Sequence, residues 1–290
     1  MVLGTLFRAA SYARPGTAPI AFRHVLSHWW RCAVHLDTFR TWIGDAGNPA
    51  LQEVLALRPS IVTCAVHPYL HSAWPAQRKL ETVAGHYALL QGRLAFLRAA
   101  SARMIELADL GDGLQIQIEA PGKFEHEGQL VINLVRDQLR LYSLAFTFGH
   151  VSGKRVAYIG ALQGLHSPDA LPIYRALTHR MHGLRPRDLL VTAFRALCLA
   201  LGFRRILAVS DHDRVSSNPY FASSSQVFAS YDSAWLENGG IATRDGFFEL
   251  GASLTPRSAE DIPSRKRAQY RRRYALLTDL SAQIARCVPE

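Results

Sequence analysis

The sequence predicts an α+β fold in which a helical N-terminal region, residues 1–110, precedes a mixed α/β domain, residues 111–290. Three observations lead to this prediction. Apolar residues recur with a helical period before residue 107, segments with an alternating period follow, and a strongly apolar helix then lies between two short strands. We therefore expect a mixed sheet that combines an antiparallel meander with a β-α-β crossover.

Composition limits the class of protein and its partners. Of the 290 residues, 49% are hydrophobic and 19% are charged, which excludes intrinsic disorder. The four cysteines form no C-x-x-C pair, and the N-terminal apolar stretch is too short for a secretion signal, so we expect a cytoplasmic protein without a bound metal. The formal net charge of +10 favours an acidic carrier protein, an anionic small molecule or an anionic membrane surface as partner, whereas nucleic acid is not expected.

The N-terminal region contains two segments with helical periodicity. One extends from Ile20 to Trp42, and the other extends without proline from Ala76 to Leu107, where Gly85 and Gly92 are points of bending or interruption. Prolines punctuate the stretch between them, so we expect two helices joined by an irregular connection.

Four segments after Leu107 are predicted to form consecutive antiparallel strands with short connections. The first of them alternates strictly between apolar and polar residues, and turn signals separate the others. The predicted strands are Leu114–Glu119, Gln129–Val135, Leu139–Phe148 and Val156–Leu162.

A crossover helix is predicted next, over Leu184–Leu201, with a proline near its start and a glycine just after its end. Its polar stripe is thin, so we expect a largely buried helix. The apolar strand Ile206–Ser210 follows and is expected to pair in parallel with Val156–Leu162. The polar stripe consists of Asp188, Thr192 and Arg195.

The C-terminal section is predicted to contain three further elements. They are a short helix over Ser230–Asn238, a strand over Phe247–Leu250 and a basic helix over Ser264–Arg286.

This order of elements resembles the GNAT-like acyl-CoA N-acyltransferase core. The resemblance implies that the two parallel strands splay apart and admit the thioester of acyl-CoA or of an acyl carrier protein, with no cofactor held tightly. It also implies that backbone N–H groups at the start of the crossover helix bind the diphosphate. The family's motif R/Q-x-x-G-x-G/A is matched by Arg180 and Gly183, whereas Arg185 stands where the family has a small residue.

A second resemblance covers residues 120–280, where several strings are similar in order and spacing to the VirK/YbjX family of bacterial proteins. That family is associated with virulence and cell-envelope phenotypes, and the resemblance implies no particular reaction. The strings are Ile159–Gly164, His182–Pro186, Ala208–Ser210, Tyr231–Trp235, Ile262–Arg267 and Tyr270–Tyr274.

Two acidic and histidine-containing segments are candidates for general-base chemistry. His212 lies between two aspartates after the parallel strand, where ligand crevices open, and flanking carboxylates would raise its pKa. Glu125, His126 and Glu127 precede the second strand of the meander, where an extended chain would place the two glutamates on one face. Solvated loops are the alternative for both segments, and a metal cluster is a further alternative for the second.

Tyr231 is a candidate acid, because in GNAT-like enzymes a tyrosine after the splayed strands can protonate the leaving thiolate. Tyr220 is a rival for this role, and core packing with Trp235 is the alternative for Tyr231. The neighbouring Asp232 lies at the same helix start, and capping of that helix is the alternative to a functional role for it.

Candidate binding residues lie at the end of a strand and on the basic helix. Gln163 and Gly164 end a predicted strand, and the glycine would allow a ligand to approach the backbone, although a plain turn explains it equally well. Arg267 and Arg271 share one face of the basic helix, which would bind an acidic carrier, lipid head groups or nucleic acid, or else be a solvated face paired with nearby acids.

Taken together, these residues favour an enzyme that moves an acyl group from a thioester carrier to an amine or hydroxyl. His212 or one of the two glutamates would be the base, and backbone N–H groups near Gln163 and Gly164 would stabilise the oxyanion. The arginines at 180 and 185 and the basic helix would hold the carrier. The alternative is a basic binding factor, without enzymatic activity, for an anionic lipid, peptide or carrier protein in envelope stress or virulence.

Overall fold

The computed structural model describes residues 30, 32–34, 36–43, 47–218, 221, 230–253, 258 and 260–289. Most of the helix expected over residues 20–42 therefore lies outside the described residues, and its described part includes helix α3 (Leu36–Ile43). Within the described residues, no helix combines the length and the apolar character needed to cross a bilayer.

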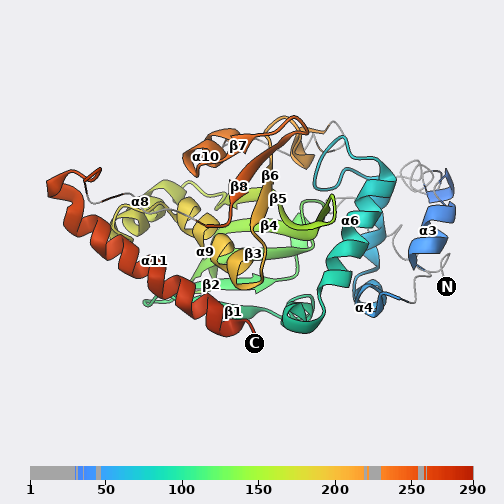
Figure 1. Ribbon diagram of the computed structural model, residues 1–290, viewed down its shortest axis with the longest axis horizontal. Helices are drawn as coiled ribbons and strands as arrows, with labels where there is room; N and C mark the ends of the chain where they lie inside the picture. The colour runs from blue at the N-terminus through green and yellow to red at the C-terminus, as the bar shows by residue number, and fades with distance from the viewer. Residues whose placement is uncertain are drawn as a thin grey trace.

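A mixed sheet of eight strands organises the fold, in the order β1-β2-β3-β4-β5-β6-β8-β7 (Figure 1). Among the strand pairs in the part of the chain that the structure describes, only β5–β6 is parallel, and the other neighbouring pairs are antiparallel. The strands are β1 (Ile105–Asp109), β2 (Leu114–Glu119), β3 (Leu130–Arg136), β4 (Leu139–Val151), β5 (Lys154–Gly164), β6 (Arg205–Val209), β7 (Ile241–Ala242) and β8 (Phe247–Gly251). The meander and the parallel crossover that the sequence predicts are confirmed.

Helices lie beside and across this sheet (Figure 1). Helix α9 contacts β3, β4 and β5, α11 contacts α9 and β1, and α6 contacts β4. One continuous hydrophobic core joins the N-terminal helices, the sheet and α9. The remaining helices are α4 (Pro49–Leu57), α5 (Thr63–Val66), α6 (Ala76–Leu89), α7 (Phe96–Ala99), α8 (Ala170–Arg180), α9 (Pro186–Ala200), α10 (Tyr231–Glu237) and α11 (Arg267–Cys287).

The single helix predicted over Ala76–Leu107 is confirmed only over its first part. Helix α6 ends at Leu89, and the chain becomes strand β1 at Ile105. The chain leaves the helical conformation here because it pairs with a neighbouring strand. Strand β1 pairs with β2, beginning at Ile105 with Ile118, and so supplies the backbone hydrogen-bonding partners for the edge of β2 that a helix could not.

Hairpin geometry lengthens two predicted strands. The connection between β4 and β5 needs only Ser152 and Gly153, which both have positive φ, at 50° and 75°. Such a two-residue turn matches the twist of the flanking strands, and β4 and β5 therefore remain paired as far as Val151 and Lys154.

Helix α9 is more buried than the sequence suggests. Arg195, predicted to be part of a polar stripe, is buried, and its guanidinium donates to the carbonyl oxygen of Asn238 at 2.6 Å. Burial lowers its pKa to about 10. This carbonyl lies at the C-terminal end of α10, where the helix dipole is negative. It therefore offsets part of the cost of burying the charge of Arg195, although Asn238 is distant in sequence.

Candidate functional site

Strand β5 extends beyond the end of its parallel neighbour β6. Their pairing begins at Val156 with Arg205 and ends at Ile159 with Ala208. Gly160 forms a β-bulge at this point. Ile159 faces Phe146 of β4 and Ala161 faces Ala145, so Gly160 has no partner of its own on β4. Beyond this bulge β5 continues without β6, because β6 ends at Val209, one residue after its last partner. The splaying of the two strands that the GNAT-like resemblance implies therefore stays a prediction.

Two aromatic side chains of α10 contact the ends of β6 and β5. The indole of Trp235 donates to the carbonyl oxygen of Val209 at 2.8 Å, at the end of β6. The phenol of Tyr231 interacts with the main chain of Leu162 and the side chain of Gln163, at the end of β5. Tyr231 is 5% exposed and Trp235 is fully buried, so the expected core packing of this pair is present.

The phenol of Tyr231 is held in its protonated form. Burial raises its pKa to about 12, and the charge of Glu127 contributes, while hydrogen bonding from Leu162 and the charge of Arg214 oppose the rise. A phenol in this state can donate a proton or a hydrogen bond at neutral pH.

Glu127 lies against the bulge of β5. A Cβ atom on Gly160 would overlap the carbonyl oxygen of Glu127, so the glycine allows the two backbones to touch. The residue is half-buried, and desolvation of its carboxyl group, with a further contribution from Glu125, raises its pKa to about 8. This carboxyl can therefore exchange protons near neutral pH.

The two neighbours of Glu127 have structural partners. The carboxylate of Glu125 accepts a hydrogen bond from Ser60 at 2.9 Å, and burial raises its pKa. The ring of His126 lies 3.1 Å from the carbonyl oxygen of Pro68, and burial lowers its pKa to about 4. The extended conformation expected for this segment is wrong, because the chain forms turns after a short 3-10 helix.

His212 does not lie between two carboxylates as expected. Its side chain is 91% exposed, and its Nδ1 atom is 3.1 Å from Asp213. The carboxylate of Asp211 instead accepts hydrogen bonds from Ser230 and from the N–H groups of Tyr231 and Asp232 at the start of α10. The geometry therefore places His212 in a solvated loop.

Other expectations for this region are also corrected. The N-cap of α10 is Ser230, whose hydroxyl accepts from the N–H of Ser233, rather than Asp232. Tyr220 lies outside the described residues.

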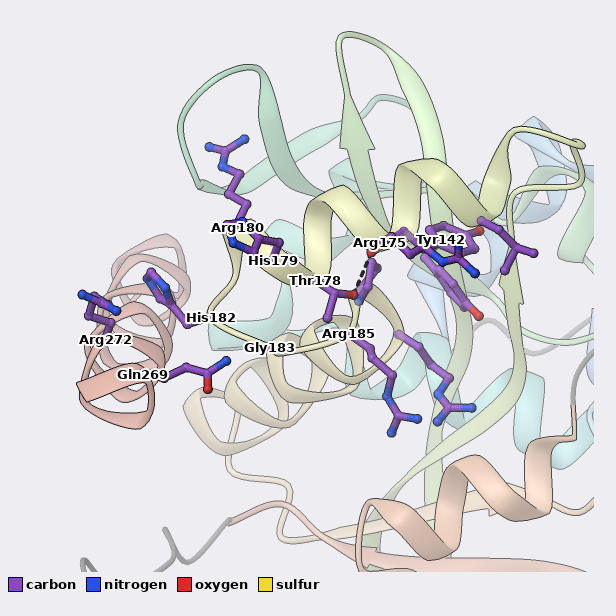
Figure 2. Close-up of a pocket in the computed structure, with 14 residues that line it drawn as sticks. Tyr142, Arg175, Thr178, His179, Arg180, His182, Gly183, Arg185, Gln269 and Arg272 are labelled. Carbon is purple, nitrogen blue, oxygen red and sulfur yellow. Dashed lines mark hydrogen bonds between the residues drawn. The ribbon is translucent and has the colours of Figure 1, made fainter. Parts of the chain in front are cut away.

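A cavity of about 1090 Å³ opens between α8, the start of α9 and α11 (Figure 2). We call it the basic groove, because five arginines and two histidines line it together with apolar and aromatic residues. Its lining contains none of Glu127, His212 and Tyr231. The lining residues are Tyr142, Leu171, Tyr174, Arg175, Thr178, His179, Arg180, His182, Gly183, Arg185, Pro186, Arg187, Gln269 and Arg272.

The arginines of the groove differ in how much of their charge is neutralised. Arg185 pairs with Asp188 at 2.7 Å and with Glu237, and Arg187 pairs with the same two carboxylates. Arg180 turns away toward the β1–β2 turn, where it pairs with Asp112 and donates to two carbonyl oxygens (Figure 2).

The predicted role of Arg180 and Arg185 as carrier ligands is therefore weakened, since both guanidinium groups have protein partners. Two other groove arginines, Arg175 and Arg272, are exposed, and they form no ion pair within the described part of the chain. They are the residues whose charge is available to an anion.

The loop between α8 and α9 does not offer the N–H groups that the GNAT-like motif implies. The N–H of Gly183 donates to Thr178, and the N–H of Leu184 donates to Met181. Asp188 also places a carboxylate in the first turn of α9, at the positive end of the helix dipole. An anion in the groove would thus depend on side chains rather than on this loop's amides.

His182 has an unusual backbone conformation in this loop. It follows the C-cap of α8 with a φ of 55°, in the left-handed region where helices usually place glycine. The N–H of His182 donates to His179, and that of Gly183 donates to Thr178, which completes a Schellman motif. Arg273 of α11 donates two hydrogen bonds to the carbonyl oxygen of His182, at 2.9 and 3.1 Å.

Replacing His182 by Gly should raise the free energy of unfolding by roughly 0.5–1 kcal/mol, because glycine adopts this conformation without the steric cost of a Cβ atom. Urea unfolding followed by circular dichroism would measure the change. A substitution of Gly153 by Ala at the positive φ of the β4–β5 turn should change stability in the opposite direction. A destabilised His182→Gly protein would show that the histidine side chain itself holds the turn.

Gly164 makes close contacts with protein rather than leaving room for a ligand. A Cβ atom there would lie 2.5 Å from the hydroxyl of Tyr174 and 3.0 Å from the ring of Tyr142. Both tyrosines line the basic groove, while the preceding Gln163 contacts Tyr231. The last residues of β5 therefore connect Tyr231 to the groove.

Several groove residues are absent from the sequence-based prediction. Helix α8 itself was not predicted, although Asp169 before it, basic residues in its last turn and a glycine after it are ordinary boundary signals. No sequence signal links Glu237 to Arg187, because the two residues are 50 positions apart. The unpredicted residues are Tyr142, Leu171, Tyr174, Arg175, Thr178, His179, His182, Arg187 and Gln269, whereas Arg272 belongs to the basic helix that the sequence analysis assigns to carrier binding.

Comparison with known proteins identifies relatives of the chain. The family described as "Protein of unknown function (DUF535)" matches residues 20–286. The uncharacterized protein YbjX of Escherichia coli strain K12 is 27% identical over 254 residues, which cover 84% of this chain and 77% of that protein.

Further relatives match shorter parts. An uncharacterized protein of Haemophilus influenzae is 34% identical over 126 residues, 43% of this chain and 41% of its own length. The membrane protein LapB of Mannheimia haemolytica is 23% identical over 188 residues, which cover 65% of this chain and 81% of that protein. No solved structure matches the chain.

Proposed function

The chain belongs to the DUF535 family, and on this premise we propose that it transfers an acyl group from a thioester carrier to an amine or hydroxyl acceptor. One observation carries the proposal: β5 loses its parallel partner after Ile159, and the edge beyond it faces the phenol of Tyr231. This arrangement follows a meander and a crossover helix, as the resemblance to the GNAT-like core implies.

Glu127 is the proposed base. A pKa of about 8 allows the carboxylate to take a proton from the acceptor near neutral pH, and it lies close enough to affect the pKa of Tyr231. The deprotonated nitrogen or oxygen then attacks the thioester carbonyl, whose oxyanion would accept the main-chain hydrogen bond that Leu162 gives to the phenol in the free protein. Exposed His212 has no part in this scheme.

The thiolate leaves when the tetrahedral intermediate collapses. Tyr231 gives its proton to the sulfur, and Glu127 returns the acceptor's proton to the phenolate, so both groups regain their starting states. Because Tyr231 has a pKa of about 12, it keeps its proton at neutral pH. Its transfer to the thiolate, which is a weaker base than the phenolate, is completed by the proton that Glu127 returns to the phenolate.

The carrier's phosphate groups are proposed to bind in the basic groove, through Arg175 and Arg272. Residues 162–164 of β5 connect this groove to Tyr231, so a long carrier arm could reach the diverging strands from there. We place the reaction in the cytoplasm, because three of the four cysteines are buried free thiols, as a reducing compartment allows.

Turnover of a thioester is the direct test. Incubation with an acyl-CoA or an acyl carrier protein and an amine acceptor should release free thiol above the uncatalysed rate. Tyr231→Phe should lower kcat about tenfold, a modest effect because a thiolate is already a good leaving group. Tyr270→Phe, a similar change on α11, should have no effect.

Absence of thiol release with both donor types would contradict the transfer reaction. Full activity of Tyr231→Phe would leave transfer in place and remove the tyrosine from it.

A binding factor without catalysis is the second candidate, and a specific observation favours it. The groove with its two available arginines is separate from Glu127 and Tyr231, and α10 fills the gap between the strands. Thermal stabilisation by an anionic ligand with no thiol release would support this function; a ligand at 100 times its Kd adds about 2.7 kcal/mol.

A further inference from the structure

The N-terminal part of α11 and the turn before it form a strongly basic projection, which we call the basic arm, residues 264–273. Figure 1 shows this end of α11 extending beyond the sheet and the other helices. The first turn of α11 contains no acidic residue, and the charged side chains of the arm form no ion pair within the described residues. The charges are Arg265, Lys266, Arg267, Arg271, Arg272 and Arg273.

The solvated-face alternative expected nearby acids to pair with the arm. In the structure they do not neutralise its charges. The carboxylate of Asp261 accepts instead from the hydroxyl of Ser258 at 2.9 Å. Arg267 donates to the carbonyl oxygen of Ile262 at 3.2 Å, which leaves its positive charge uncompensated.

The placement of these charges is unfavourable for the isolated protein. Cations at the start of a helix oppose its dipole, and like charges four positions apart, such as Arg267 and Arg271, repel each other. An anionic partner on this face would remove both effects. The arrangement therefore fits a surface that is used for binding.

The arm is continuous with the basic groove. Arg272 belongs to both, and on the inner side of the helix Arg273 holds the carbonyl oxygen of His182. Gln269 lies beside Gly183 on the same side, and Figure 2 shows its side chain on α11 pointing toward the α8–α9 loop. A partner bound to the arm is thus placed next to the mouth of the groove.

The side chains of the arm favour a protein partner over a bilayer. Ala268, which lies among the arginines, is small and exposed, and no large hydrophobic side chain is exposed on the arm to insert into lipid. Five of the six charges are arginines, whose guanidinium groups bind carboxylates in a two-pronged geometry. An acidic protein surface meets these requirements.

We propose that the basic arm docks an acidic acyl carrier protein, so that the carrier's thioester arm enters the basic groove. This inference rests on the proposed transfer function and names its donor as protein-bound rather than free acyl-CoA. Electrostatic docking of this kind acts mainly on the association rate and weakens with salt.

A comparison of two donors tests the proposal. The double variant Arg265→Glu and Lys266→Glu reverses two exposed charges at the tip of the arm, outside the groove lining. The matched control is Lys154→Glu with Arg286→Glu, which changes the net charge equally at exposed positions away from the arm. Each protein is assayed with the same acyl group on holo acyl carrier protein and on coenzyme A.

We expect kcat/KM for the carrier protein to fall about tenfold or more in the arm variant, with no such loss in the control. The rate with acyl-CoA should stay within a factor of about two. The loss should shrink when ionic strength rises from about 0.1 M to about 1 M, where the Debye length falls from ~10 to ~3 Å.

Equal rates with the carrier protein for wild type and arm variant would overturn the docking proposal and leave transfer intact. If neither donor is turned over, the transfer function is contradicted. The docking proposal is then decided by the Kd of holo acyl carrier protein, which should be higher for the arm variant than for the wild type. Binding of the wild type to vesicles of phosphatidylglycerol and phosphatidylcholine in equal amounts, without binding to the carrier protein, would also overturn it.

Discussion

Glu127→Gln should stabilise the protein by about 2–3 kcal/mol above pH 8 and abolish most of the proposed transfer activity. The folded state holds this carboxyl with a pKa of about 8, whereas its ordinary value is 4.5. Each pKa unit is worth about 1.4 kcal/mol, and partial exposure of the residue reduces the full effect. Glutamine keeps the shape and hydrogen bonds of the protonated acid and never has to ionise.

The sign of the pH dependence follows from proton binding. Between pH 4.5 and about 8 the folded protein binds more protons at Glu127 than the unfolded chain does, so wild-type stability falls as pH rises through this range. Below pH 4.5 both states are protonated at this residue, and wild type and Glu127→Gln should be equally stable.

Urea unfolding across this pH range measures the effect, and Glu260→Gln, at an exposed position, is the control that should stay within about 0.5 kcal/mol of wild type. In the transfer assay, loss of the base should lower kcat/KM by about 10²–10⁴. A variant whose stability parallels wild type at every pH would show that the carboxyl is well solvated, and this residue would no longer be a suitable base.

Gly160→Ala should destabilise the protein by about 2–4 kcal/mol, because the new methyl group would overlap main-chain atoms of Glu127 rather than a flexible side chain. It would also lie 2.9 Å from Leu70. The clash would move the turn that holds Glu127 away from the bulge in β5, so activity should fall together with stability.

Gly85→Ala is the matched control for this substitution. Gly85 lies in α6, and no atom lies within 4 Å of the position of a new Cβ atom. Alanine favours the helix by about 0.5–1 kcal/mol over glycine, so this variant should be slightly stabilised. Equal stability of Gly160→Ala and wild type would mean that the turn shifts freely, and the close contact between Gly160 and Glu127 would have no role in placing the carboxyl.

Local pattern was sufficient for most elements of the fold. Strict alternation predicted β2 to the residue, and the apolar run with proline before it and glycine after it predicted α9. These signals are local, since they depend on side-chain period and backbone preference. The family resemblance, which rests on strings of adjacent residues, is confirmed by the match over residues 20–286 and by the similarity to YbjX.

The candidate site was predictable only in part. Glu127 and Tyr231 were candidates from residue type and position, but so was His212, which the structure exposes to solvent. The difference depends on burial, because only desolvation raises the pKa of Glu127 to about 8, and burial comes from segments distant in the chain. The neutralised charge of Arg185 likewise depends on Glu237, which is 52 positions away.

The sequence by itself determined the alternation of strands, the buried crossover helix, the parallel pairing of β5 with β6 and the cluster of charges on α11, because each follows from the order and type of neighbouring residues. The tertiary structure alone decided where β5 and β6 part, that α10 covers the gap, which arginines keep a free charge, and that the arm and the groove form one surface. Those features arise from contacts between segments far apart in the chain, and such contacts are set by packing and desolvation rather than by local pattern.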